Sequence, residues 1–537
     1  MQALRIVLIS GGVGSGKSTL SEALQTQFEF HVLKTKKRIL DRYPEAQSER
    51  GELQRLGDAL DRRTKGTWVR DDLIRYIDDQ PEGPLSIVVD AVRIPEQVDA
   101  IRRAFGPRVF HVHLKGKESL LAARYLHRTK GGVDKEFRSY KAVRKNPTEH
   151  HIDRLEAMAD SVIAIDGYTR KDVLIRAASH LGLYGNGQGR VVDVIVGGQF
   201  GSEGKGHICS YLAPEYSVLL RVGGPNAGHK VFQSPEPYTH RQLPSGTLFS
   251  AAKLLIAPGS VISVDALLKE AADCGVDKQR LCIDPAAMVI TESDRKKEEA
   301  LVNEIGSTGQ GVGIAMARRI LDRGKLRHTL AKNTPALKPF CKPIAEELER
   351  AYARRDRILV EGTQGTGLSL YHGTYPHVTS RDTTVAGCLS EAGIPPSRVR
   401  RIIMVCRSYV IRVKSPSGRT SGHMSQEISW EEISKRSGLP LKELKGGELG
   451  SVSGKQRRVA EFDWSLLRRA TTLNAPTDIA LTFADYLDSK NTEARRFEQL
   501  TDETIRFAEE IEKVANAPVS LISTRFHWRS IIDRRSW

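Results

Sequence analysis

Long hydrophobic runs are missing from this chain. Among its 537 residues there is no stretch of about 18 consecutive apolar residues, which argues against a membrane-spanning helix. The opening stretch "MQALRIVLISGG" is apolar but short, lacks the basic start and cleavage site of a signal peptide, and runs directly into a glycine loop. A buried strand explains it better. We therefore expect a cytoplasmic protein with no membrane partner.

Cysteine is scarce as well. The six cysteines are scattered and form no C-x-x-C pair, which argues against a zinc site or a disulfide framework and fits a reducing cytosol. Apart from two glycine loops, repeats and low-complexity segments are also missing. A content of 39% hydrophobic and 27% charged residues is typical of a globular protein. At about 100–200 residues per domain, the length favours two to four domains.

The charge balance is strongly basic, with 82 lysines and arginines against 65 acidic residues and a net charge of +17. Such a balance favours anionic partners, of which nucleic acid is one. No RNA- or DNA-binding motif supports that reading, and nucleotide phosphates would need basic clefts just as much. We therefore favour nucleotides over nucleic acid, and keep a nucleic-acid-binding ATPase as an alternative.

Short β-branched runs alternate with helical patterns in the first third of the chain. The runs that predict strands are 3–9, 85–92, 108–114 and 160–167. This alternation predicts an α/β fold, a mostly parallel sheet flanked by helices. The glycine-rich, polar stretch "GLYGNGQGR" (182–190) is the best linker candidate. We expect two P-loop-type α/β domains, at 1–187 and 190–537.

The first glycine loop, "GGVGSGKS" (11–18), matches G-x-x-x-x-G-K-[ST] between a predicted strand and a predicted helix. Its glycines let backbone N–H groups turn toward phosphate oxygens, and the helix start adds a positive end. Lys17 would supply charge to the terminal phosphates and Ser18 would hold Mg²⁺. The predicted phosphate-loop residues are Gly11, Gly14, Gly16, Lys17 and Ser18.

A second group of residues predicts what this domain phosphorylates. Asp90 and Arg93 follow an apolar strand, at the sheet edge where open α/β folds bind ligands. Their segment, "VVDAVRIPEQVDAIRRA", resembles the D-x-R-x-P-x-E stretch of phage-type deoxynucleoside monophosphate kinases. Arg124 and Arg128, in "ARYLHRTKGG", are candidates for a basic lid. We interpret 1–187 as a nucleotide kinase, with a regulatory ATPase as the runner-up.

The second glycine loop carries a further resemblance. "VVDVIVGGQFGSEGKGHICSYLA" (191–213) is similar to the opening of the adenylosuccinate synthetase family, whose loop reads G-D-E-G-K-G-K. Eight later segments resemble the family in the same order: "RVGGPNAGHKV" (221–231), "QLPSG" (242–246), "GSTGQGVG" (306–313), "VEGTQGTGLSLYHGTYPHVTS" (360–380), "RSYVIRV" (407–413), "SGKQRRVAEFD" (453–463), "LTFADYLD" (481–488) and "IST" (522–524).

The resemblance implies a ligase that joins L-aspartate to the 6-carbon of a purine nucleotide. In this family the 6-oxygen is first phosphorylated by a nucleoside triphosphate, and the aspartate amine then displaces it. Mg²⁺ is the expected cofactor, with Gly228 as a predicted ligand in this domain.

The implied roles of residues are as follows. His229 is the expected general acid, Gln364 would hold the 6-oxygen region, and Ser202 is the third catalytic candidate. The triphosphate and its base would contact Gly201, Glu203, Gly204, Lys205, Gly206, Asp485 and Ser523, with Thr524 nearby. The purine monophosphate would contact Asn226, Thr308 and Thr379. The carboxylates of aspartate would contact Lys455, Arg457 and Arg458.

Three departures from the family pattern bear on specificity. Ser202 stands where the family has an aspartate that removes the purine N1 proton, and a hydroxyl is a poor base. A phage subfamily, 2-aminoadenylosuccinate synthetase, carries the same change, uses deoxy-GMP in place of IMP, and leads to the DNA base 2-aminoadenine. Lys455 and Gln456 replace arginines. Phe483 replaces the lysine of the base-reading motif, which leaves ATP, dATP and GTP as possible donors.

The resemblance also implies a homodimer, with Arg323 or Arg327 reaching the neighbour's nucleotide. A ligase acting on monophosphates beside a kinase acting on monophosphates makes a coherent pair. The alternative is a nucleotide-sensing regulatory or antiviral protein whose second site is degenerate.

Overall fold

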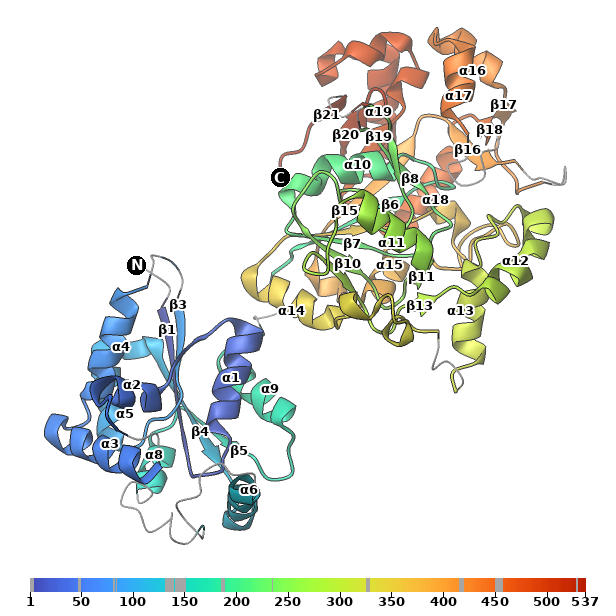
Figure 1. Cartoon of the computed structure of the whole chain (residues 1–537). Coiled ribbons are helices and arrows are strands. Elements are labelled where there is room, and N and C mark those ends of the chain that lie inside the picture. The colour runs from blue at the N-terminus through green and yellow to red at the C-terminus, as the bar shows by residue number, and fades with distance from the viewer. Residues whose placement is uncertain are drawn as a thin grey trace. The chain divides into compact units, whose positions relative to one another are not determined.

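The computed structural model describes residues 4–46, 50–80, 83, 85–130, 140, 151–184, 189–233, 235–324, 329–414, 420–449, 457–527 and 530–537. The chain forms two compact units, Met1–Gly185 and Asn186–Trp537, which we call unit 1 and unit 2 (Figure 1). Of the predicted site residues, Lys455 lies outside the described residues, as do Gln456, Arg327 and the side chain of Arg128. Among the described helices, none combines the length and apolar character needed to cross a bilayer.

Unit 1 is built on a five-stranded parallel sheet in the order β2-β3-β1-β4-β5. Its strands are β1 Leu4–Gly11, β2 His31–Leu33, β3 Leu85–Val89, β4 Val109–Lys115 and β5 Ser161–Ala164. Its helices are α1 Lys17–Phe28, α2 Thr35–Arg42, α3 Arg50–Thr64, α4 Trp68–Asp78, α5 Pro95–Phe105, α6 Glu118–Lys130, α8 Ile152–Ala157 and α9 Arg170–His180.

Side-chain alternation along β1 explains the three layers of unit 1. Val7 and Ile9 pack with the buried residues of α1 and α9, while Ile6 and Leu8 pack with those of α3, α4 and α5. Figure 1 shows these helix groups on opposite sides of the sheet. Both faces of β1 are therefore buried, as expected for a central parallel strand.

Unit 2 is built on a nine-stranded sheet in the order β12-β10-β7-β14-β6-β15-β19-β20-β21, in which only β21 runs antiparallel to its neighbour. In that order the strands are Leu281–Ile283, Lys253–Ile256, Val218–Arg221, Ile358–Glu361, Val192–Gly197, Val399–Arg407, Asp478–Thr482, Val519–Ser523 and Ile531–Asp533. The smaller sheets pair β8 His229–Val231 with β9 Tyr238–His240, β11 Val261–Ile262 with β13 Met288–Val289, and β18 Arg457–Ala460 with β16 Val410–Val413 and β17 Glu427–Ile428.

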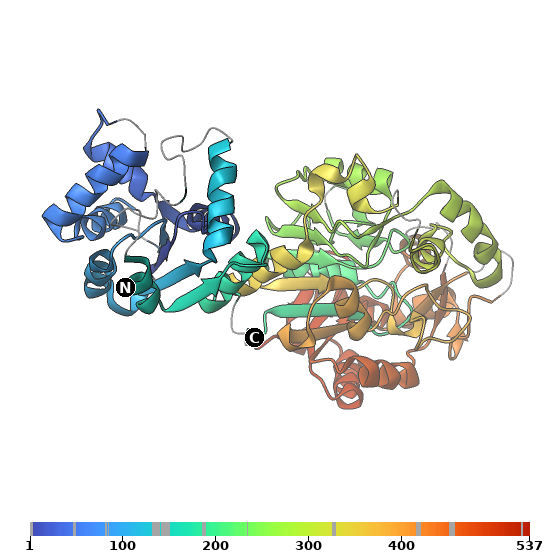
Figure 2. The same cartoon turned by 90° about the horizontal axis from the view of Figure 1, so that it is seen from below.

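Helices cover both faces of this larger sheet (Figure 2). They are α10 Lys205–Leu212, α11 Val264–Asp273, α12 Glu292–Ile305, α13 Val312–Leu321, α14 Ile344–Arg354, α15 Val385–Ala392, α16 Trp430–Ser437, α17 Leu441–Gly447, α18 Trp464–Asn474 and α19 Asp502–Ala515. One core joins β6 to α14, α15, α18 and α19, and the other joins it to α10 and α11. The expected α/β class, with mostly parallel sheets flanked by helices, is confirmed for both units.

Candidate nucleotide-binding sites

The glycine loop of unit 1 connects β1 to α1. Gly14 and Gly16 have φ angles of +85° and +93°, a region that glycine adopts without strain. Lys17 folds back over the loop, and its Nζ donates to the carbonyl oxygens of Gly11 at 2.6 Å and Gly12 at 3.1 Å. Ser18 is exposed at the first turn of α1. The loop therefore has the backbone shape, the cation and the helix start that a phosphate chain requires.

Two chambers flank this loop. One, of about 280 Å³, is lined by Gly14, Gly16, Thr19 and Arg124, and we call it the Arg124 chamber. The other, of about 270 Å³, is lined by Gly11, Lys17, Trp68 and Arg93, and we call it the Trp68 chamber. Arg124 and Arg93, both predicted from sequence, thus line different chambers.

Asp90 follows β3 near the Trp68 chamber, whose lining includes the next residue, Ala91. Its Oδ1 accepts hydrogen bonds from the backbone N–H of Thr35 at 2.9 Å and from the Thr35 hydroxyl at 3.0 Å. Burial raises the pKa of Asp90, against the hydrogen bonds from Thr35 and the charge of Lys17. The carboxylate therefore anchors the start of α2 beside the phosphate loop.

The glycine loop of unit 2 connects β6 to α10, and it is closed by a buried ion pair. Lys205 Nζ lies 2.5 Å from Glu203 Oε2, and both side chains are buried. Glu203 Oε1 also accepts from the backbone N–H groups of Gln199 at 3.1 Å and Gly201 at 2.8 Å. Ser202 is exposed on this loop with a φ of +58°. Glu203 therefore shapes the loop, while the Ser202 side chain remains accessible.

His229 begins the hairpin β8–β9, directly against the first turn of α10. A Cβ placed on Gly206 would lie 2.8 Å from the Cβ of His229, so glycine is needed for this approach. His229 Nδ1 forms a hydrogen bond with Oε1 of Glu361, the last residue of β14. His229 and Lys205 thus converge on the same helix start, and the imidazole has a carboxylate partner.

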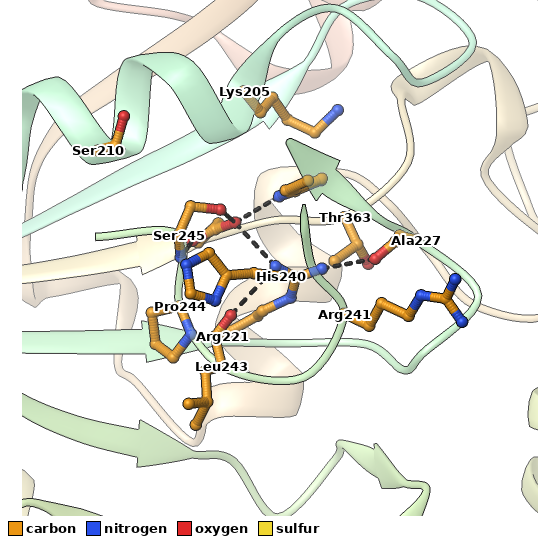
Figure 3. A network of polar contacts seen from close by, with 12 residues as sticks. Lys205, Ser210, Arg221, Ala227, His240, Arg241, Leu243, Pro244, Ser245 and Thr363 are labelled. Carbon is orange, nitrogen blue, oxygen red and sulfur yellow. Dashed lines mark hydrogen bonds and ion pairs between the residues drawn. The ribbon is translucent and has the colours of Figure 1, made fainter. Parts of the chain in front are cut away.

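Glu361 is at the centre of a larger buried network. Its carboxylate accepts from Arg221 Nη1 at 3.2 Å, from the Ser245 backbone N–H at 2.7 Å and from the Ser245 hydroxyl at 2.5 Å. Arg221 also donates to the carbonyl oxygens of Leu243 at 3.2 Å and Ala227 at 2.7 Å. Figure 3 shows Arg221 among these partners, with Lys205 drawn above them. The network connects four segments of unit 2 behind His229.

The pKa shifts of this pair fix the tautomer of His229. Burial, with the charge of Arg221, lowers the pKa of His229 to about 4, although Glu361 acts in the opposite direction. Burial alone would raise the pKa of Glu361, but Arg221, His229 and Ser245 outweigh it and bring that pKa to about 2. Glu361 is therefore ionised at neutral pH and accepts the proton on Nδ1, which leaves Nε2 of the neutral imidazole as an acceptor.

Two further predicted residues carry polar atoms without partners. Gln364 has a φ of +57°, and its Cα lies 3.5 Å from where a Cβ on Gly201 would be. Its Oε1 accepts from the Thr363 hydroxyl at 2.8 Å, but its buried Nε2 has no hydrogen-bond partner among the described residues. The buried Oδ1 of Asn226 has none there either. Such atoms are uncommon in folded proteins, and a water, an ion or a ligand can complete their bonding.

The two predicted phosphate-contact threonines lie in loops and are half-buried. The backbone N–H of Thr379 donates to Leu368 O at 2.8 Å, and Thr308 O accepts from Gln310 Nε2 at 3.3 Å. These bonds hold the two loops, and among the described residues none joins either threonine to Asn226.

The arginines assigned to aspartate are paired with carboxylates of the protein. Arg457 Nη1 donates to Glu448 Oε2 at 2.9 Å, and Arg458 forms a two-point ion pair with Glu427. Glu448 Oε1 also accepts a hydrogen bond from Arg407 Nη2 at 2.6 Å. Substrate carboxylates would therefore exchange with, or add to, carboxylates already present.

The region assigned to the donor base contains a carboxyl group with an unusual pKa. Asp485, in the short helix Ala484–Tyr486, has an Oδ1 that is buried without a partner among the described residues. Burial raises its pKa to about 7. Phe483, in place of the family's lysine, lies under Arg407, whose Cζ is 3.9 Å from the ring centre. Ser523 is buried, and its hydroxyl donates to Arg525 O at 3.1 Å.

The sequence did not single out the partners that orient the site. Glu361 and Arg221 both stand in segments that resemble the family, but the resemblance gives neither of them a role. Both are buried charged residues at the carboxyl ends of parallel strands, and this position was the available signal. Arg407, buried at the carboxyl end of β15, carries the same signal, but its partner Glu448 does not, because Glu448 lies in the turn after α17 and the two residues meet only in the fold.

The chain matches known proteins over unit 2. A sequence model of adenylosuccinate synthetase matches residues 194–336 and 321–492. The adenylosuccinate synthetase of Methanocaldococcus jannaschii is 39% identical over 352 residues, which are 64% of this chain and 96% of the relative. That of Pyrococcus horikoshii is 36% identical over 351 residues, which are 64% of this chain and 98% of the relative.

Two solved structures share the fold. The fully ligated adenylosuccinate synthetase of Plasmodium falciparum matches with a TM-score of 0.56 at 21% identity, over 65% of this chain and all of its own. The succinoaminodeoxyadenylate synthetase of cyanophage S-2L, bound to dGMP and to dATP as an energy donor, matches with a TM-score of 0.53 at 26% identity, over 65% of this chain and 96% of its own. By these matches, this chain belongs to the adenylosuccinate synthetase family of ligases.

Proposed function

We propose that unit 2 joins L-aspartate to C6 of a 6-oxopurine nucleoside monophosphate. The purine 6-oxygen attacks the γ-phosphorus of a nucleoside triphosphate, the N1 proton leaves, and a nucleoside diphosphate departs. The aspartate amine then bonds to C6, and inorganic phosphate leaves with the 6-oxygen. The observation that carries this proposal is the convergence of Lys205, His229 and Gln364 on one glycine loop.

The residues of the unit 2 site have separate roles in this reaction. Backbone N–H groups and the start of α10 bind the phosphate chain, and Lys205 leaves Glu203 to neutralise it. His229 contacts the phosphate group in transfer through Nε2, in the orientation that Glu361 sets. Gln364 binds the 6-oxygen through its unpartnered Nε2. Asn226, Thr308 and Thr379 bind the 5′-phosphate, and Arg457 and Arg458 bind aspartate.

The bound triphosphate should change the protonation of His229. Its pKa is lowered to about 4 in the ligand-free protein. Phosphate oxygens beside Nε2 favour the imidazolium and raise that pKa toward or beyond the ordinary value of about 6.5. Triphosphate binding at pH 6 should therefore take up protons, and affinity should fall as the pH rises through the bound-state pKa. Calorimetry in two buffers with different ionisation heats measures this uptake, and an uptake that persists in His229→Ala would contradict it.

Ser202 supports deoxy-GMP over IMP as the purine substrate. A serine hydroxyl leaves room beside the purine 2-amino group and can accept a hydrogen bond from it. The cyanophage relative, which was solved with dGMP, supports the same choice. Because the buried Lys205, His229 and Glu361 are all in place, we prefer a changed substrate to an inactive site.

The substitution Ser202→Asp tests this choice. It restores a carboxylate base for the N1 proton and crowds the 2-amino group. We expect the ratio of kcat/KM for IMP to that for dGMP to rise at least about tenfold, a modest part of what a positioned base supplies. Initial rates of phosphate release with each monophosphate measure the ratio. Ser202→Ala, which removes the hydroxyl without adding charge, is the matched control. An unchanged ratio in Ser202→Asp would show that this position does not discriminate.

The decisive experiment for unit 2 is adduct formation. Full-length protein is incubated with L-aspartate, ATP or GTP, and one of IMP, GMP, dIMP or dGMP, and the products are identified by mass spectrometry. The proposal expects a succinyl adduct only when all three reactants are present. If no monophosphate yields an adduct while calorimetry shows tight nucleotide binding, the nucleotide-sensing alternative replaces the ligase.

The phosphoryl donor is proposed to be ATP or dATP, although the family recognises the guanine base of GTP. A carboxyl group with a pKa of about 7, such as Asp485, can donate to a ring nitrogen when it is protonated, as adenine N1 requires. Phe483 supplies an aromatic face in place of the lysine. The cyanophage relative was solved with dATP as an energy donor.

Mg²⁺ fits both loops. This ion prefers oxygen ligands and is often bound by one or two protein groups together with substrate phosphates. Ser18 in unit 1 and the Gly228 carbonyl in unit 2 offer such oxygens, and no cluster of three or more His, Cys, Asp or Glu occurs among the described residues. When bound, the ion would neutralise phosphate charge during transfer.

We also propose a homodimer, for which the exposed Arg323 is the described candidate to reach the neighbouring site.

Unit 1 is proposed to be a nucleoside monophosphate kinase. Its phosphate loop lies between two chambers, whereas a regulatory ATPase needs only one nucleotide pocket. The Arg124 chamber would take the donor triphosphate and the Trp68 chamber the acceptor. Formation of a nucleoside diphosphate without aspartate tests this activity, and ATP hydrolysis with every acceptor left unmodified would favour the ATPase.

A further inference from the structure

The Trp68 chamber contains features that the roles assigned so far do not use. Its lining combines the cations Lys17 and Arg93 with the aromatic ring of Trp68 and the amide of Gln97. Trp68 and Gln97 are buried. Such a mixed lining suits a ligand with an anionic group and a flat ring, because the ring can stack and the anion can pair with the cations.

One buried carboxylate holds two of these lining side chains. Trp68 Nε1 donates to Asp61 Oδ1 at 2.6 Å, and Gln97 Nε2 donates to the same oxygen at 2.8 Å. Gln97 Oε1 in turn accepts from the backbone N–H of Arg93 at 2.8 Å. Asp61 on α3 therefore fixes side chains from α4 and α5 and, through Gln97, the residue that carries the chamber's guanidinium.

The second oxygen of Asp61 is left without a donor. Asp61 is 7% exposed, and its Oδ2 has no hydrogen-bond partner among the described residues. A buried carboxylate oxygen in this state is costly unless a water or a ligand supplies a donor. Trp68 turns the N–H edge of its indole toward Asp61. Asp61 does not itself line the chamber but lies behind Trp68 and Gln97, so the edge of a ring stacked on that indole would reach the same carboxylate past these side chains.

The geometry points to Trp68 and Asp61 as the base subsite of the phosphoryl acceptor, which is a guanine-type nucleoside monophosphate. This inference rests on the kinase activity proposed for unit 1. Guanine presents N1–H and the 2-amino group side by side, so both can donate to Asp61 Oδ2. Adenine presents the lone pair of N1 beside its amino group, and thymine has no amino group.

Arg93 is the residue proposed to bind the phosphate group of the acceptor. Its Nη2 lies 4.0 Å from Asp58 Oδ1, and a Cβ on Gly57 would lie only 2.9 Å from its Nη1. Gly57 is inside α3 and has no positive φ, so the close approach of Arg93, and not the backbone, explains why a side chain is missing. Arg93 is thus held where a chamber-bound phosphate can pair with it.

The proposed step is a simple transfer. A phosphate oxygen of the monophosphate bonds to the γ-phosphorus of the donor triphosphate, and the bond from that phosphorus to the β–γ bridging oxygen breaks. The products are two nucleoside diphosphates, and no further reactant is needed.

The test uses full-length protein with ATP and Mg²⁺, without aspartate, and one acceptor at a time: dGMP, dIMP, dAMP, dCMP or dTMP. Diphosphate products are separated by chromatography. We expect kcat/KM for dGMP to exceed that for dAMP and dTMP at least about tenfold, and dIMP, which lacks only the 2-amino group, to be intermediate. Equal use of all five acceptors, or preference for another base, would overturn the inference while leaving the kinase proposal standing. If no acceptor is phosphorylated although ATP binds, the kinase proposal itself fails.

Two variants separate the base end from the phosphate end. Asp61→Asn keeps an oxygen for Trp68 and Gln97 but places an N–H₂ where the base must donate, so the ratio of dGMP to dAMP use should fall at least about tenfold. Gly57→Ala should push Arg93 aside and raise KM for every acceptor by a similar factor, with base preference unchanged. Alanine is the better helix former, which offsets the close contacts of the new Cβ with Arg93 and with Ile39 Cδ1 at 3.3 Å, so Gly57→Ala should change the melting temperature little. If Asp61→Asn slows all acceptors equally, Asp61 only supports the fold, and the base subsite is refuted.

Discussion

Replacing His229 by alanine should reduce adduct formation by about 10²–10⁴-fold, the usual contribution of a positioned acid–base group. The imidazole is buried against Gly206 and hydrogen-bonded to Glu361, so the substitution removes a proton carrier that the fold holds in one orientation. Diphosphate formation by unit 1 should be unchanged, since His229 belongs to the core of unit 2. The measurement is the rate of succinyl adduct formation beside the rate of diphosphate formation in one preparation.

Glu361→Gln is the informative companion to His229→Ala. It keeps the shape of the side chain but removes the charge that holds Nδ1–H, and it also leaves Arg221 with an uncharged partner. If Glu361 positions the imidazole, kcat should fall and its pH profile should shift, whereas KM for the monophosphate should change little.

A His229→Ala variant that retains more than a tenth of adduct formation, with the same melting temperature, would refute the role given to the imidazole.

The sequence predicted much of the fold because local signals and tertiary structure agree there. The segment "PEQVDAIRRAF" has a proline at its start and an amphipathic pattern, both typical of a helix, and it forms α5 from that proline to the last residue of the segment. The run "RIIMVCRSYVIRV" behaves differently. It is rich in apolar residues on both sides of Arg407, yet it divides there into β15 of the large sheet and β16 of a small antiparallel sheet. Periodicity cannot show that two adjacent apolar runs belong to different sheets.

The site was less accessible to sequence reasoning for a related reason. Glycines and lysines of a phosphate loop act within one local segment, and their spacing alone carries the signal. His229 and Glu361 are 132 positions apart in the sequence. The hydrogen bonds that Asp61 accepts from Trp68 and Gln97 likewise join three different helices. Such pairs exist only once β8, β14 or the helices of unit 1 have packed. Asp485 likewise owes its raised pKa to burial, which composition does not reveal.

Replacing Lys17 by alanine should lower diphosphate formation by about 10²–10³-fold or more, the scale seen when a preorganised donor to a developing charge is removed. Lys17 is half-buried, and its Nζ donates to the carbonyl oxygens of Gly11 and Gly12 in the loop that it serves. Because Lys17 belongs to unit 1, adduct formation by unit 2 should proceed at the original rate, and the melting temperature of unit 1 checks that its fold survives. Chromatography of the diphosphate made from the acceptor monophosphate, without aspartate, measures the first activity, and mass spectrometry of the adduct measures the second.

Lys205→Ala is the matched control, because the same lysine position in the second loop should give the opposite pattern. It should abolish adduct formation and spare diphosphate formation, but with one physical difference. Lys205 is the ion-pair partner of the buried Glu203, and loss of one member of a buried pair costs about 3–5 kcal/mol. Lys205→Ala should therefore also lower the melting temperature of unit 2, whereas Lys17→Ala should not. Loss of both activities in Lys17→Ala, with both units still folded, would mean that the two loops do not work independently.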